Sequence, residues 1–180
     1  MVIIYFLARY KPDTMARDLQ GDTALHCLAR AGDARAARRL LQLDTERGRG
    51  LVSLANTAGQ TAAHVAASRG HTDFLTVLRD FNDDFSTQDN EGQTPLHLCV
   101  MADLTGNAIL LKCNVIYLQK SIFSDNLECL KFLLRSCKDV NKKNGDGLAP
   151  IHLAVDSNIL TMNLLLESGA NINLKEDETG

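Results

Sequence analysis

The sequence has no tryptophan, and aromatic residues make up only 5% of its 180 residues. So few aromatic rings argue against a surface on which nucleic acid bases stack. The formal net charge of −3 argues against electrostatic binding of a nucleic acid backbone, which requires a basic surface. We therefore expect no direct binding of nucleic acid.

Signals for secretion or membrane insertion are also lacking. The apolar N-terminal run is interrupted at Arg9 and has no basic region before it, so it is a poor signal peptide and too short to span a membrane. The odd number of cysteines and the absence of a C-x-x-C pair favour a reducing compartment over a disulfide framework. The cysteines are Cys27, Cys99, Cys113, Cys129 and Cys137. We expect a cytoplasmic or nuclear protein without a membrane partner.

An internal repeat is the strongest positive signal in the sequence. Four segments align on a shared histidine: G-D-T-A-L-H-C-L-A from Gly21, G-Q-T-A-A-H-V-A-A from Gly59, G-Q-T-P-L-H-L-C-V from Gly92 and G-L-A-P-I-H-L-A-V from Gly147. Asp or Asn precedes each glycine by three residues, and this pairing predicts a turn with a left-handed glycine. The threonine then predicts the cap of a short helix, and an apolar stripe such as that of Leu127, Leu130 and Leu134 predicts a second helix.

These segments resemble ankyrin repeats, because His64 and His97 are 33 residues apart, which is the ankyrin period. The resemblance implies an all-α ankyrin-repeat solenoid with about four repeats and the start of a fifth. We expect an N-terminal extension over residues 1–17 and an ankyrin-repeat domain over 18–180. Its units would span about 18–55, 56–88, 89–143 and 144–176. No polar cap follows the fourth unit, so its outer face should be exposed and the chain should be part of a longer protein.

The third unit contains extra residues, because His97 and His152 are 55 residues apart. Aligning Asp103 with Asp125 places an insert at about 104–124, between the two helices of that unit. Two interpretations remain open. The insert is an added helix or strand packed outside the stack, or it is a translated intron rich in residues with AT-rich codons.

Within the ankyrin class, the chain resembles the IκB family of NF-κB inhibitors and co-regulators. The similar segments are G-D-T-A-L-H from Gly21 with its long linker to Leu54, N-G-D-G-L-A-P-I-H-L-A-V from Asn144, and L-L-L-E-S-G-A-N-I-N from Leu164. The resemblance implies a Rel homology region as partner, held along the hairpin fingers and the concave face. The D-S-G-x-x-S motif of signal-triggered degradation is absent from the first twenty residues.

The sequence offers little for catalysis or metal binding. One histidine per repeat (His26, His64, His97 and His152) favours a structural role, in which the ring bonds neighbouring backbone. No cysteine and histidine pair has zinc-finger spacing, and no nucleotide or nucleophile motif occurs. We expect no enzyme activity, no cofactor and no metal.

Partner binding is expected at positions that flank each finger glycine and at positions just after each first helix, where side chains should face solvent. The candidates are Gln20, Asp22, Arg30, Thr57, Gln60, Ser68, Arg69, Asn90, Glu91, Gln93, Met101, Asp146, Leu148, Asp156 and Ser157. Met101 and Leu148 are the preferred hot spots, because solubility alone would not favour exposed apolar residues there.

A basic cluster stands apart from these candidates and contains Arg35, Arg38, Arg39, Arg47 and Arg49. It is either a solvated face or a docking site for an acidic partner. We expect a monomer in isolation that acts as a protein-binding module. The leading hypothesis is an IκB-like regulator. The alternatives are a generic ankyrin scaffold and the ankyrin portion of a larger protein.

Overall fold

The computed structural model describes residues 13–43, 50–81, 83, 85–102, 119–156 and 159–175, with the backbone alone for 119–125 and 156. These residues form helices joined by turns and contain no strand, as predicted. The helices are α2 (Ala24–Ala31), α3 (Ala34–Leu43), α5 (Ala62–Ala67), α6 (Thr72–Asp80), α8 (Gln119–Ser136), α9 (Pro150–Leu153), the 3₁₀ helix η1 (Ala154–Asp156) and α10 (Ile159–Glu167). Residues 50–52 and 95–102 are also helical.

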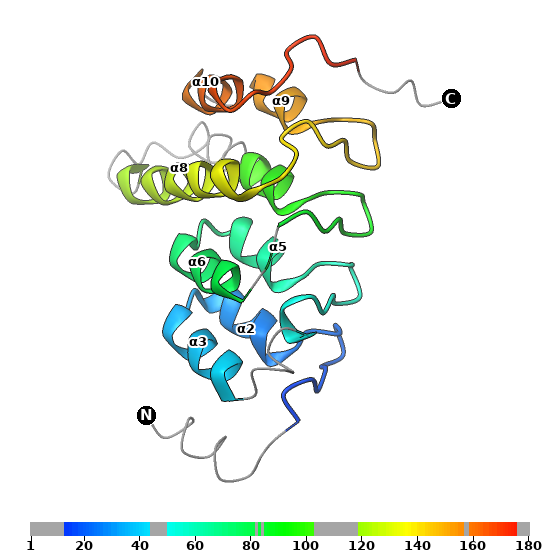
Figure 1. Ribbon diagram of the computed structural model, residues 1–180, viewed down its shortest axis with the longest axis vertical. Helices are drawn as coiled ribbons and strands as arrows, with labels where there is room; N and C mark the ends of the chain where they lie inside the picture. Colours follow the sequence, from blue (N-terminus) through cyan, green and yellow to red (C-terminus); the bar gives the residue numbers. More distant parts are fainter. Residues whose placement is uncertain are drawn as a thin grey trace.

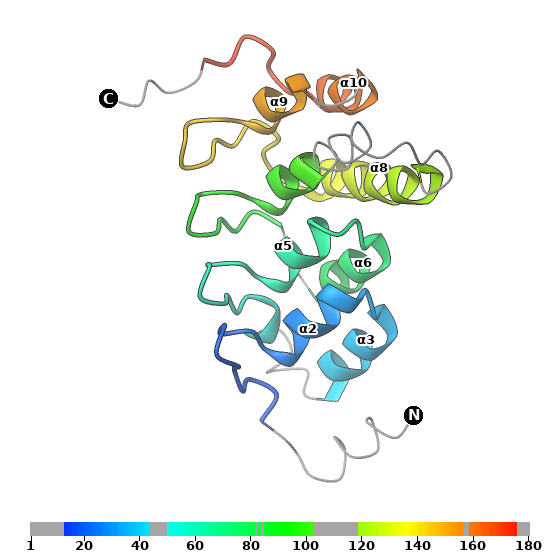
Figure 2. The ribbon, with the colours of Figure 1, turned by 180° about the vertical axis from the view of Figure 1, so that it is seen from behind.

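The helices are arranged in two rows (Figures 1 and 2). The first helices of the units (α2, α5, residues 95–102 and α9) lie beside the hairpin fingers, and the second helices (α3, α6, α8 and α10) form the outer row. Helices pack against their counterparts in the next unit, as α2 does with α5, α3 with α6, α6 with α8 and α8 with α10. The fingers all project from the same edge of the stack.

The core lies between the two rows and between successive units. Outer-row helices contribute large buried side chains, among them Leu41, Phe74, Leu78 and Leu165, whereas α5 contributes small ones. Every residue of α5 is buried, and four of its six residues are alanine. Small side chains let the first helices of neighbouring units approach closely, so the stack is continuous from unit to unit.

Helix α8 is longer than the other outer-row helices, with 18 residues against 10 in α3 and 9 each in α6 and α10. It begins at Gln119, before Asp125, where the sequence predicts that the repeat resumes. The last part of the expected insert is therefore helical backbone continuous with the repeat. The rest of the insert, residues 104–118, lies outside the described residues, so the choice between its two interpretations is not tested there.

Candidate functional site

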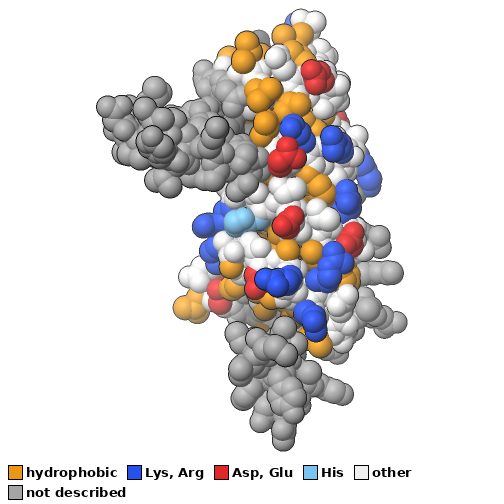
Figure 3. All heavy atoms as spheres, turned by 90° about the vertical axis from the view of Figure 1, so that its left-hand side faces the viewer, with side chains coloured by type: hydrophobic (Ala, Val, Ile, Leu, Met, Phe, Trp, Pro, Cys, Tyr) orange, Lys and Arg blue, Asp and Glu red, His pale blue; other side chains and the backbone are white. Residues whose placement is uncertain are grey.

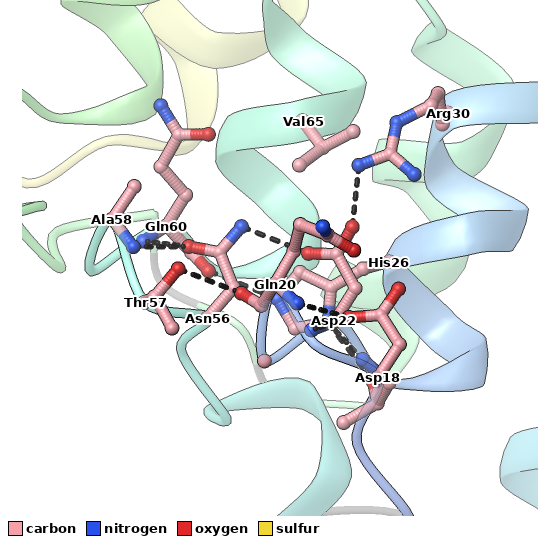
Figure 4. A network of polar contacts seen from close by, with 12 residues as sticks. Asp18, Gln20, Asp22, His26, Arg30, Asn56, Thr57, Ala58, Gln60 and Val65 are labelled. Carbon is pink, nitrogen blue, oxygen red and sulfur yellow. Dashed lines mark hydrogen bonds and ion pairs between the residues drawn. The ribbon is translucent and has the colours of Figure 1, made fainter.

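The four fingers share one turn geometry, which the sequence predicts. Each begins with Asp or Asn, whose Oδ1 accepts two backbone N–H groups. Asp18 accepts from Gln20 at 2.9 Å and from Asp22 at 2.8 Å, as Figure 4 shows. The glycine adopts a left-handed backbone, with φ of 75° at Gly21, a conformation that favours glycine. The turn is thus held by hydrogen bonds from its backbone N–H groups to the Asp or Asn side chain. The other side chains at its tip project from it.

Backbone hydrogen bonds join each finger to the next in one register. The N–H of Thr57 donates to the carbonyl of Gln20 at 3.0 Å. The same contact joins Asn90 to Ala58 at 3.1 Å and Gly145 to Glu91 at 2.8 Å. A Cβ added at Gly92 would stand 2.4 Å from the nitrogen of Gly145, so this register also requires glycine there. The fingers therefore form a continuous ridge and not four independent loops.

The repeated histidines link the units, and their predicted structural role is confirmed. The backbone N–H of Thr23 donates to His26 Nδ1 at 3.2 Å, so Nε2 is the protonated ring nitrogen. Nε2 then donates to the carbonyl of Gln60 in the next unit, at 2.9 Å. Equivalent bonds to the next unit reach Gln93 from His64 and Leu148 from His97, and His152 bonds the carbonyl of Leu174 at the end of the fourth unit. Burial lowers the pKa of His64 and of His97 below the ordinary 6.5, which favours this neutral form.

Asp22 lies at the centre of a polar network between the first two fingers (Figure 4). Its carboxylate pairs with Arg30 and accepts a hydrogen bond from Asn56 Nδ2 at 2.8 Å. Burial by itself raises the pKa of Asp22. The bonds from Asn56 and Arg30 outweigh it, so the pKa is lower than usual. Asp22 thus fixes the second finger relative to the first, and Arg30 is the member of the pair that faces solvent.

The candidate binding residues fall into four groups. Eight are exposed, as expected: Gln20, Arg30, Thr57, Ser68, Arg69, Asn90, Glu91 and Asp146. Gln60, Met101 and Leu148 are half-buried, so the two apolar hot-spot candidates face solvent only in part. The backbone alone is described for Asp156, and Ser157 lies outside the described residues.

The expectation of solvent exposure is wrong for Asp22 and Gln93, whose exposed fractions are 3% and 6%. Asp22 is enclosed by its partners Asn56 and Arg30. Gln93 turns its Nε2 towards Glu91 Oε2, at 2.7 Å, and its backbone carbonyl is the acceptor for His64. Both positions hold the ridge together, so their side chains are less accessible to a partner than those at the tips.

One exposed residue was missed by the sequence analysis. Leu19, at the tip of the first finger, is 96% exposed. It stands immediately after Asp18, where Thr57 and Asn90 stand in the next two fingers. A large apolar residue at a position that holds Thr, Asn or Gly in the other fingers was the signal that could have found it. The finger ridge therefore begins with an apolar side chain at its first tip. It continues to the exposed acidic residues Glu91 and Asp146 in the third and fourth fingers.

The outer face of the fourth unit is exposed, as the sequence predicts. Val155, Ile159, Leu160, Leu166 and Ile172 are exposed hydrophobic residues of this unit. Within the described part of the chain, no helix is long and apolar enough to cross a membrane. The same residues contain no group of three or more His, Cys, Asp or Glu side chains placed to hold a metal ion.

Two family models match the chain. Residues 50–119 match the model described as ankyrin repeats (3 copies), and residues 146–177 match the model described as ankyrin repeat. Together with the helical stack, these matches confirm the predicted all-α ankyrin-repeat solenoid. An ankyrin stack is a protein-binding module, so the ridge of fingers is its candidate binding surface. The boundaries of the individual units remain a prediction.

The relatives that cover most of the chain include the following three. The rat nuclear factor NF-kappa-B p105 subunit is 27% identical over 93% of this chain, and the human B-cell lymphoma 3 protein is 30% identical over 91%. Mouse Rabankyrin-5 is 30% identical over 88%. The chain spans 15%, 32% and 14% of these proteins, respectively. Identity alone therefore does not separate a relative named for NF-kappa-B from one that is not.

Proposed function

We propose that this chain, which belongs to the ankyrin-repeat family, is an IκB-like regulator that binds a Rel/NF-κB transcription factor. Binding would control the localisation of that factor or its access to DNA. The cytosol and the nucleus are the compartments in which such a regulator acts. Its role is binding, with no cofactor, and it is a monomer in the absence of the partner.

The similarity to the NF-kappa-B p105 subunit over 93% of the chain is the main support. It coincides with the IκB-like segments that begin at Gly21, Asn144 and Leu164. The ridge supplies suitable geometry, since backbone bonds and the Asp22 network hold its tips in fixed positions. A preorganised surface loses little conformational freedom when it binds.

A generic scaffold with an unrelated partner is the second candidate. Rabankyrin-5 matches the chain at 30% identity over 176 residues. This identity is as high as that of the two NF-κB-related proteins, so identity does not favour them. The ridge of fingers would serve either role. The two candidates differ in the partner and not in the surface, so a binding measurement separates them.

Titration of the full 180-residue chain against a purified Rel homology dimer in a calorimeter tests the proposal. We expect saturable binding, which Asp146→Arg weakens about tenfold because it reverses the charge of a fingertip. Asp73→Arg is the matched control, since it makes the same charge change at an exposed position of α6, in the outer row. It should leave the affinity unchanged.

Circular dichroism must first show that both variants keep the helical content of the parent chain. Absence of binding at high micromolar concentration, from a folded chain, would overturn the NF-κB assignment in favour of the scaffold. Equal losses in Asp146→Arg and Asp73→Arg would instead contradict the finger ridge as the binding surface.

A further inference from the structure

The outer row of helices bears a strip of basic side chains that the finger ridge does not include. We define the basic strip as Arg35, Arg38 and Arg39 of α3, Arg79 of α6, and Lys131 and Arg135 of α8. Figure 3 views this face and shows Lys and Arg side chains gathered along one half of it. We propose that the basic strip, with the apolar surface of α10 beyond it, is a second docking site for an acidic protein segment that has apolar residues at one end.

The strip is continuous across three units. Arg38 of α3 bonds Asp80 of α6 at 2.7 Å, and the guanidinium of Arg79 lies 4.8 Å from the ring centroid of Phe132 in α8. These two contacts link neighbouring helices through the side chains of the strip itself. A partner that lies across the outer row would therefore meet one cation after another.

Positive charge exceeds negative charge along this surface. Asp80 is paired with Arg38, and Glu128 is paired with Lys131 at 2.9 Å. In the part of the chain that the structure describes, Arg35, Arg39 and Arg135 form no ion pair. These three guanidinium groups are exposed and can each donate two hydrogen bonds to a carboxylate. The excess is local, because the whole chain has a formal charge of −3.

The same face becomes apolar at the fourth unit. Arg35, Asp73 and Glu128 each stand five residues before a buried leucine, and Leu160 holds that position in α10. Leu160 is 48% exposed, and Leu166 of the same helix is also exposed. Helix α10 contains no lysine or arginine. This position thus holds charged side chains in the first three units and an apolar one in the fourth.

This pattern favours an acidic protein segment over a nucleic acid. Asp73, Asp80 and Glu128 would repel any polyanion equally, but a nucleic acid backbone is charged along its whole length and has no group that would bury Leu160. An acidic segment with apolar residues at one end matches both parts of the surface. Helices pack about 8–10 Å apart, so α3 to α10 spans about 24–30 Å, the length of about 7–9 extended residues.

Fluorescence anisotropy with a labelled probe peptide tests this site. The probe has six residues of alternating Asp and Gly, followed by Leu-Gly-Leu, and is titrated with the full chain at low salt. We expect Arg39→Glu to weaken binding at least fivefold, and Asp73→Arg to strengthen it at least twofold. Arg69→Glu is the control for a charge reversal outside the strip, because Arg69 is exposed in the turn between α5 and α6 and is not a member of the strip; it should change affinity less than twofold.

A second probe, in which serine replaces both leucines, tests the apolar end. Leu160→Ser should weaken binding of the leucine probe at least threefold and should leave the serine probe unaffected. Equal effects of Arg39→Glu and Arg69→Glu would overturn the proposal, as would tighter binding of a single-stranded oligonucleotide of equal charge. Because these residues lie outside the finger ridge, the result is independent of the Rel titration.

Discussion

One position of the repeat is buried between units in the first three units. In the fourth unit the same position lies on the outer face and is exposed. Ala29, Ala67 and Val100 each stand three residues after the repeat histidine, and all three are fully buried. Val155 stands at the equivalent position of the fourth unit and is 65% exposed. The difference shows that burial at this position comes from the following unit and not from the unit's own fold. Stability in such a stack therefore depends on the interfaces between units as well as on the units themselves.

A charge introduced at this position should give the largest difference in stability loss between the two regions. Val100→Asp should destabilise the stack by about 3–5 kcal/mol, because it leaves an uncompensated charge in the core. Val155→Asp should change stability by less than about 0.5 kcal/mol, as surface substitutions usually do. Urea unfolding followed by circular dichroism measures both. Similar losses in the two variants would mean that Val155 is also covered in solution.

A smaller contrast separates two glycines with left-handed backbone. Gly92→Ala should cost more than about 2 kcal/mol, because the 1–2 kcal/mol of left-handed strain is added to a clash with the backbone of Gly145, 2.4 Å away. Gly169→Ala should cost only the strain, since no atom lies within 4 Å of its added Cβ. The same unfolding experiment ranks the two. If Gly169→Ala were the more damaging, the tight finger joint would not be a main determinant of stability.

The smallest expected effect is a dependence on pH that originates in the internal joints. Burial lowers the pKa of His64 and His97, so the unfolded chain takes up protons first as the pH falls below about 6.5. The stability these residues provide is therefore complete above that pH and decreases below it. The urea midpoint should fall between pH 7.5 and 5.5, and less steeply after His64→Gln or His97→Gln. An unchanged slope in both variants would assign the effect to other groups.

Most of the fold could be predicted, because its signals are local. Asp18 with Gly21 defines a turn, and Thr23 with His26 defines a helix start, without reference to distant residues. Exposure at the candidate site could be predicted only in part, since it depends on contacts between units. Asp22 is buried because Asn56 and Arg30 enclose it, and neither contact follows from the pattern within one repeat. Helix α8 begins at Gln119, earlier than the repeat predicts. The structure of the insert could not be predicted, because a period of 33 residues describes only the repeat itself.

The uniform finger register has a consequence for how such a chain changes over evolutionary time. Each joint uses a backbone N–H, a backbone carbonyl and one histidine, and Thr57, Asn90 and Gly145 occupy the same place in successive joints. A tandem duplication of residues 56–88 would present these groups at both of its ends. The gene can therefore lengthen by whole units without remaking its interfaces. The duplicated fingertips and outer helix would then be free to diverge towards new partners.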